Sequence, residues 1–163
     1  MSETRVNAPA GTPFIEVERE FDAPRDLVFR AWTDPKLVVR WLGPRRLQMR
    51  IDRWELDEHG GGYRYIHSGD DGVEHAFHGS FHRTTTDPYT ILQTFEYEGA
   101  PGHVSLDELH LEERGGRTLA RIRSVHQTVE ARDAMVQAGM AEGMNDGFDK
   151  LDELLAGELA TAL

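Results

Sequence analysis

The sequence contains no cysteine, so disulfide bonds and thiolate chemistry are excluded and the apolar core must hold the fold together. It has no apolar run near the roughly 18 residues that a membrane-spanning helix needs, so we expect no membrane partner. Positive charge is scarce, because 18 Lys and Arg residues stand against 29 Asp and Glu residues, and the formal net charge is −11. Since binding to a phosphate backbone needs clustered cations, the sequence predicts no nucleic-acid partner.

Signatures of nucleotide binding and of nucleophilic catalysis are also missing. There is no P-loop or dinucleotide fingerprint, and the triplet Gly60-Gly61-Gly62 lacks the strand-to-helix setting that cradles phosphate. None of the serines that we considered, Ser68, Ser80, Ser105 and Ser124, has the G-x-S-x-G context. The sequence therefore predicts no cofactor and gives no firm catalytic signature.

The length of 163 residues fits one domain. Residues 1–13 are small and polar and lack the apolar segment of a signal peptide, so we expect a flexible N-terminal tail and a cytoplasmic protein. The predicted domain spans residues 14–156, and residues 157–163 are predicted to be a C-terminal tail.

The first part of the domain predicts one strand and two short helices. Residues 14–21 alternate apolar and charged side chains, which is typical of a strand with one solvated face. Pro24, two residues after Asp22, and Pro35, directly after Asp34, mark two helix starts. Gly43-Pro44 ends the second helix.

The middle of the chain predicts six strands, with a bulge before Trp54. They lie around Leu47–Leu56 and Tyr63–Tyr65, and at residues 73–83, 91–97, 104–113 and 118–126. The segment His59–Gly62 is predicted to be a turn, and Asp71-Gly72 a hairpin turn. Because the turns are this short, neighbouring strands should pair antiparallel.

The last segment, Glu130–Ala156, predicts one long helix with Thr128 as its N-cap. Its buried stripe is Met140, Met144, Phe148, Leu151 and Leu155.

Three glycines, Gly139, Gly143 and Gly147, recur every fourth residue beside that stripe. Each costs about 1 kcal/mol relative to alanine inside a helix. We therefore expect either a close backbone contact along this line or room for a ligand.

These elements predict an α+β fold of the helix-grip type. We expect a curved antiparallel β-sheet of about six to seven strands wrapped around a long C-terminal α-helix. Two short helices after the first strand should close one end.

Three blocks of residues carry a resemblance to a known family. They are Phe21-x-Ala23-Pro24-x-x-x-Val28-Phe29-x-Ala31-Trp32-Thr33-Asp34-Pro35 with Arg40-Trp41; Gly61-Gly62-x-Tyr-x-Tyr65 with Phe77-x-Gly79-x-Phe81; and Glu130–Ala134, Gly139-Met140, Glu142-Gly143 and Gly147–Leu151. Over roughly residues 14–156 the chain resembles the START-like superfamily, also called SRPBCC or Bet v 1-like. Within it, the chain is most similar to the branch named after the activator of the Hsp90 ATPase.

The resemblance implies a helix-grip fold with a cavity for hydrophobic ligands between sheet and helix. Some relatives are polyketide cyclases or aromatases. The eukaryotic activator has a further domain that takes part in chaperone binding, and that domain has no counterpart in this sequence. The resemblance therefore does not by itself carry a chaperone role.

Large aromatic and methionine side chains are the main candidates for lining that cavity, because ligand sites are mostly apolar and methionine adapts to varied shapes. The predicted lining residues are Trp32, Trp41, Trp54, Tyr63, Tyr65, Phe77, Phe81, Phe95, Met135, Met140 and Met144. An ordinary filled core is the alternative for any one of them.

The histidines were considered both as metal ligands and as acid–base groups. His75, His78 and His82 fall in a predicted strand, where they do not converge, so we expect no metal site. His67 shares the inward parity of Tyr65 and is a candidate acid or base. His126 is a second candidate.

Three functions are consistent with these patterns. The first is a binding protein for an apolar or aromatic small molecule. The second is an enzyme of the cyclase or aromatase type that uses His67, Tyr65 and His126. The third is an interaction module, either a homodimer or a regulator with a chaperone partner.

Overall fold

Eight strands in one sheet and four helices make up the described part of the chain. The computed structural model describes residues 2–57, 59–157 and 159. In chain order the elements are β1 (Arg5–Asn7), β2 (Phe14–Phe21), α1 (Arg25–Thr33), α2 (Pro35–Trp41), β3 (Gln48–Asp57), β4 (Gly60–Ser68), β5 (Glu74–Thr86), β6 (Tyr89–Tyr97), β7 (Val104–Arg114), β8 (Arg117–His126), α3 (Val129–Gln137) and α4 (Met140–Ala156).

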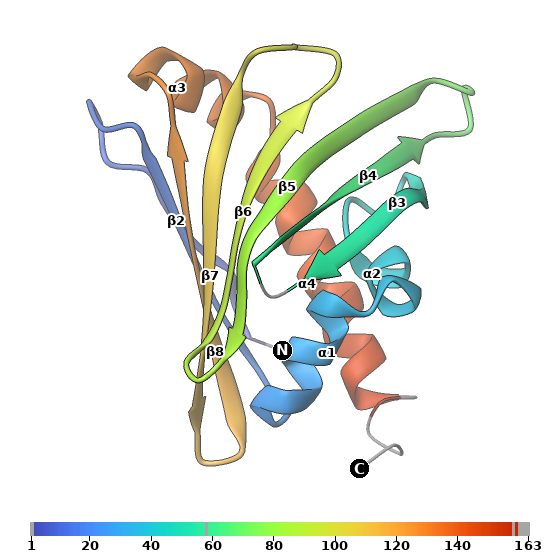
Figure 1. Cartoon of the computed structure of the whole chain (residues 1–163), viewed down its shortest axis with the longest axis vertical. Coiled ribbons are helices and arrows are strands. Elements are labelled where there is room, and N and C mark those ends of the chain that lie inside the picture. Colours follow the sequence, from blue (N-terminus) through green and yellow to red (C-terminus); the bar gives the residue numbers. More distant parts are fainter. Residues whose placement is uncertain (1, 58, 158, 160–163) are drawn as a thin grey trace.

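The strands pair in the order β1-β2-β8-β7-β6-β5-β4-β3, and every neighbouring pair is antiparallel. The first long strand is thus joined to the last, and β3 to β8 follow as a meander. The sheet bends, and α4 lies on its inner side together with α1 and α2 (Figure 1). This arrangement confirms the predicted α+β helix-grip fold. No helix among the described residues is long and apolar enough to cross a membrane.

The strand count exceeds the predicted six to seven because the segment before residue 14 joins the sheet. Strand β1 pairs with β2, with Arg5 opposite Glu18. The Pro9 carbonyl accepts a hydrogen bond from Arg132 at 2.9 Å. The prediction of a flexible tail is therefore wrong for the described residues 2–13. Of the predicted C-terminal tail, Leu159 is buried in the core, and most of the other residues lie outside the described part.

The predicted C-terminal helix is interrupted. Gly139 adopts a left-handed conformation with φ of +85°, which separates α3 from α4. A residue with a Cβ atom adopts this conformation at a cost, whereas glycine does so freely. The predicted N-cap is confirmed, because the Thr128 side chain accepts a hydrogen bond from the Ala131 amide at 3.0 Å.

Two further details concern β3 and β4. The predicted bulge is present, since the register shifts between Ile51 and Arg53. The predicted turn at His59–Gly62 is wrong in part, because β4 begins at Gly60 and its glycines pair with the end of β3, Gly61 opposite Leu56.

The densest part of the core lies where β2, α1, α2 and α4 meet. The ring of Phe148 contacts those of Phe21, Trp32 and Trp41, with ring centroids 5.6 to 6.2 Å apart. A Cβ atom at Gly147 would lie 3.1 Å from the Trp41 carbonyl oxygen, so α4 approaches the end of α2 closely here. The expectation of a close backbone contact therefore holds at Gly147.

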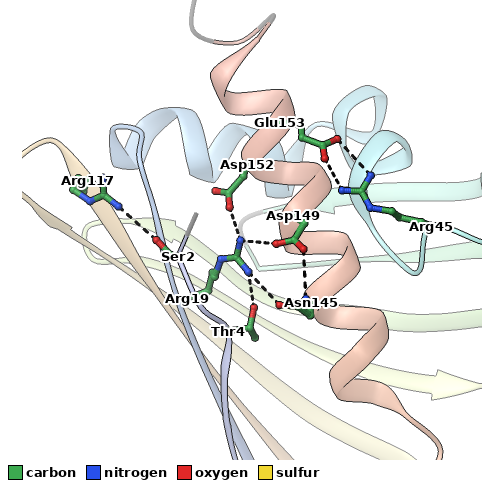
Figure 2. Close-up of polar contacts among 9 residues, drawn as sticks. All are labelled: Ser2, Thr4, Arg19, Arg45, Arg117, Asn145, Asp149, Asp152 and Glu153. Atoms are coloured by element: carbon green, nitrogen blue, oxygen red, sulfur yellow. Dashed lines mark hydrogen bonds and ion pairs between the residues drawn. The ribbon is translucent and has the colours of Figure 1, made fainter.

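A buried arginine ties α4 to the sheet (Figure 2). Arg19 on β2 is 1% exposed and lies among Asp149, Asp152 and Asn145 of α4. One of its nitrogens is 2.9 Å from the Asp149 carboxylate, and the Thr4 hydroxyl accepts another bond at 2.7 Å. The charge of Arg19 is therefore matched by acidic groups, which fixes where the helix crosses the sheet.

Candidate functional site

Beyond the aromatic core, the inner face of the sheet carries two rows of side chains. Directly opposite residues on paired strands share a face. One row runs through Phe81, Gln93, Asp107, Ser124 and Ile15. The neighbouring row contains Phe95, Ser105 and His126. The inner face therefore combines apolar side chains with a strip of polar ones across β6, β7 and β8.

Part of this face is accessible to solvent. Ile15, at the β2 end of its row, is 1% exposed, as expected for a close-packed interior. By contrast, Gln93, Asp107 and Ser124 in the same row keep intermediate exposure. Phe77, Phe95 and Ile122 on the same face are also only partly buried. Solvent therefore reaches the inner face of β5 to β8, and we call this region the concave site.

An aromatic wall borders the concave site on β4, β5 and β6. The Phe77 ring lies 5.2 Å from Tyr65, 5.4 Å from Phe95 and 5.1 Å from Tyr97, measured between ring centroids. The interplanar angles to Tyr65 and Phe95 are 25° and 24°, so the rings are nearly parallel. This wall offers ring surface to a flat or apolar molecule.

The polar strip is centred on Asp107. The Ser105 hydroxyl donates to its carboxylate at 3.0 Å, and Ser124 also bonds to it. Burial raises the pKa of Asp107 to about 6, and the two serine hydroxyls partly oppose that shift. Within the described part of the chain, Asp107 forms no ion pair with any Arg, Lys or His.

The two candidate histidines are both buried and each has one free ring nitrogen. Burial lowers the pKa of His67 to about 4, and a hydrogen bond to the Leu42 backbone opposes part of that shift. Its Nε2 atom has no hydrogen-bond partner among the described residues. Burial also lowers the pKa of His126, whose ring bonds to the Pro13 backbone while Nδ1 is unpaired in the described structure.

The hydroxyl of Tyr63 is already engaged. It donates to the Thr94 carbonyl at 2.6 Å and accepts from the Gln93 amide at 3.3 Å. Burial raises the pKa of both Tyr63 and Tyr65. Both phenols are therefore neutral at physiological pH.

The structure divides the predicted cavity residues among four places. Trp41 is buried and packs against the partly buried Trp32, with ring centroids 4.7 Å apart, away from the two rows. Trp54 joins Tyr63 and Phe81, and its indole N–H donates to the Thr33 carbonyl at 3.0 Å. Tyr65, Phe77 and Phe95 form the aromatic wall. The methionines Met135, Met140 and Met144 are partly buried against the core from α3 and α4.

Two grooves lie outside the concave site and are open to solvent. One, of about 470 Å³, is lined by Phe29, Leu56, Asp57 and residues 84–87. The other, of about 350 Å³, is lined by Pro35, Lys36, Val39 and residues 51–54. Of the predicted cavity residues, Trp54 alone lines either groove.

Comparison with known proteins assigns the family. Residues 22–156 match the family model described as Activator of Hsp90 ATPase homolog 1-like protein. The chain belongs to this family. No protein with a curated description matches it.

Solved structures agree with this assignment. A solution structure of a protein from Arthrobacter aurescens is 25% identical, with a TM-score of 0.84, and the match covers 93% of this chain and 91% of that one. A crystal structure of a protein from Rhodobacter sphaeroides is 27% identical, with a TM-score of 0.83 and coverage of 94% and 99%. CalU16 from Micromonospora echinospora is 22% identical, with a TM-score of 0.59 and coverage of 99% and 90%, so it shares the fold.

In this member of the Activator of Hsp90 ATPase homolog 1-like family, no group of three or more His, Asp or Glu residues in the described structure is arranged to hold a metal ion. His75 contacts the Tyr97 hydroxyl at 2.9 Å, and His78 faces Glu98 at 3.0 Å. His82 is exposed. The three histidines are thus directed to different partners.

Sequence reasoning missed Asp107 and Gln93, and with them the polar strip of this family member. The sequence does indicate that Ser105 and Asp107 face inward, because they share strand parity with Leu109 and Leu111, which are buried. A carboxylate at an inward position of a strand is unusual and marks a candidate site.

Proposed function

We propose that this protein binds an apolar or aromatic small molecule in the concave site. The observation that carries the proposal is the partial exposure of Phe77, Phe95 and Ile122, which face inward and share their face with core residues. Apolar side chains that stay exposed to water on an inner face are unfavourable. An apolar ligand that covers them therefore contributes a favourable free energy of binding.

Two further features support this function. The aromatic wall presents several rings at nearly parallel angles, a geometry that accommodates a planar molecule. Met135 of α3 and Met140 and Met144 of α4 are only partly buried against the core. Methionine is unbranched and polarizable, so it adjusts to ligands of different shape.

Titration with a neutral aromatic probe, 2-naphthylmethanol, tests the proposal. Backbone and methyl NMR shifts of the protein are expected to change at Phe77, Phe95 and Ile122. The variant Ile122→Trp adds volume on the inner face and is expected to abolish binding. Leu106→Phe adds an apolar ring on the outer face, where Leu106 is 42% exposed, and should leave binding intact.

Two results would contradict binding in the concave site. If the probe shifts residues of the two outer grooves instead, or binds Ile122→Trp as well as the original chain, the concave site does not bind ligand. Native mass spectrometry after mild purification gives an independent readout, because a retained ligand adds a discrete mass.

A second candidate is an acid–base enzyme of the cyclase or aromatase type. It is favoured by His67, which is neutral above its lowered pKa of about 4 and whose ring lies next to Tyr65 and Phe77. Its Nε2 atom has no hydrogen-bond partner among the described residues. Such a site orients a flexible substrate and supplies one proton-transfer group. If His67→Ala and His126→Ala both leave turnover of a linear polyketide-like substrate unchanged, these roles are excluded.

A further inference from the structure

The side chain of Asp107 faces the interior, not the solvent outside the sheet. Strand β7 pairs without a register shift with both neighbours, so its side chains alternate strictly. Leu109 and Leu111, two and four residues further on, are buried in the core, whereas Leu106 and His110 are exposed. Asp107 therefore shares the inner face with the core leucines.

Asp107 is held by hydroxyls and has no cationic partner among the residues that the structure describes. Ser105 and Ser124 lie beside and opposite it and donate to its carboxylate. A carboxylate removed from water without a cation is strongly disfavoured unless something compensates it. The side chain nevertheless keeps partial exposure, so a ligand in the concave site can reach it.

A structural role does not explain this arrangement. The backbone ladder already joins β7 to β8 without interruption from Ser105 to Arg114. The serine bonds to Asp107 therefore add little to a pairing that is complete. Buried carboxylates with shifted acidity are more typical of binding and catalytic sites.

The surroundings select the charge of the ligand. The net charge of −11 gives the molecule a negative field that attracts cations and repels anions. The unpaired Nδ1 of buried His126, in the neighbouring row, adds a free polar atom.

We propose that Asp107, held by Ser105 and Ser124, is the recognition group of the concave site and selects ligands in which a cationic nitrogen is attached to an aromatic or apolar body. This inference rests on the proposed binding function and names its ligand class. The cationic nitrogen pairs with the carboxylate, and the apolar body covers the aromatic wall.

Two matched probes test the inference, 2-naphthylmethylamine, which is a cation at neutral pH, and 2-naphthylmethanol, which is neutral and of similar size. Isothermal titration calorimetry at about pH 7.5 is expected to show at least about tenfold tighter binding of the amine. Asp107→Asn removes the charge and keeps the shape. It is expected to reduce the preference to less than about twofold while leaving the alcohol's affinity unchanged.

A matched control lies one residue away. Glu108 faces outward, where it pairs with Arg83 and His110, so Glu108→Gln removes the same charge from the outer face. This variant should keep the preference for the amine. If Glu108→Gln loses the preference as much as Asp107→Asn does, the field of the whole protein selects the cation and the proposed role of Asp107 is wrong.

The unmodified protein gives a second readout that does not depend on the folding of a variant. Lowering the pH from about 7.5 to about 5 protonates Asp107, so the amine's affinity should fall while that of the alcohol stays constant. The titratable side chains nearest to it on the inner face are Tyr63 and Tyr65 of β4 and His126 of β8. Burial and the two serines account for its own pKa, without a charged group of α3 or α4.

The two possible failures are distinguishable. If both probes bind the concave site with equal affinity, the role of Asp107 is overturned and the proposed binding function stands. If neither probe binds, the binding function itself fails.

Discussion

Two inward-facing ionisable side chains, the partly exposed Asp107 and the buried His67, act in opposite directions on the pH dependence of folding. Burial raises the pKa of Asp107 from 3.8 to about 6, so the unfolded state holds fewer protons there and stability falls as pH rises through this window. Burial lowers the pKa of His67 from 6.5 to about 4, so stability rises as pH increases from about 4 to 6.5. The two contributions largely cancel in the unmodified protein.

Replacing Asp107 with asparagine is expected to stabilise the protein at neutral pH. The gain over the unmodified chain should reach up to about 3 kcal/mol near pH 7.5 and vanish below about pH 3, where the carboxyl is protonated in both states. Urea unfolding measured between these pH values checks it. A less stable Asp107→Asn variant at neutral pH would show that the serine bonds outweigh the penalty of burial.

Replacing His67 with glutamine is expected to remove the opposite slope. The unmodified chain gains about 3 kcal/mol from His67 between pH 4 and 6.5, and His67→Gln should lack that gain. Urea unfolding over the same range measures it. His82→Gln is the control, because His82 is exposed on β5 and its loss should leave the profile unchanged.

At the scale of elements, the glycines of α4 have different functions despite their regular spacing. A Cβ atom at Gly147 would lie 3.1 Å from the Trp41 carbonyl and 3.3 Å from the Gly43 nitrogen. At Gly143 the nearest atom would be Pro44 Cδ at 3.8 Å, an ordinary contact. Close packing against α2 therefore explains Gly147 and does not explain Gly143.

Alanine substitutions at these two positions are expected to have opposite effects. Gly143→Ala should stabilise the protein by about 0.5 to 1 kcal/mol, because alanine loses less conformational entropy in a helix. Gly147→Ala should destabilise it by about 1 kcal/mol or more, because α4 must move away from α2. Thermal and urea unfolding measure both. Equal effects would mean that α4 can shift freely and that the close approach is not maintained.

At the scale of the whole molecule, the segment before β2, residues 2–12, supplies hydrogen-bond acceptors to two buried arginines, and we call it the strap. Thr4 accepts a hydrogen bond from Arg19 at 2.7 Å, and the Pro9 carbonyl accepts one from Arg132 at 2.9 Å. Both arginines are at most 3% exposed, so bulk water cannot fully replace a hydrogen-bond acceptor that either guanidinium loses. The segment therefore fastens α3 and α4 to the sheet.

Deletion of residues 2–12 is expected to lower the free energy of unfolding by about 3 kcal/mol or more, because two buried charged donors each lose an acceptor and β2 loses its neighbour. Urea unfolding of the truncated chain measures the loss. Thr4→Val, which removes one of these bonds and keeps β1, should cost less. A truncated chain as stable as the full one would show that the strap is dispensable.

The pattern of the sequence was enough for the order of the elements and for many of their bounds. The helix starts at Pro24 and Pro35, the bulge before Trp54 and the Thr128 cap are local features, determined by neighbouring residues. Strand β1 escaped prediction because three exposed residues show no alternation, and it is held by pairing with β2. The break at Gly139 was hidden within an otherwise continuous helical pattern.

The sequence by itself determined the family, the helix-grip fold and the inward parity of Tyr65 and His67, because these follow from local periodicity and short motifs. The tertiary structure decided which inward residues meet. It packed Trp41 into the core beside Trp32, left Phe77 and Phe95 accessible, and placed Asp107 opposite Ser124 on neighbouring strands. The reason is physical: burial and charge pairing depend on which segments, distant in sequence, pack together in space. The spacing of residues along the chain does not specify those contacts.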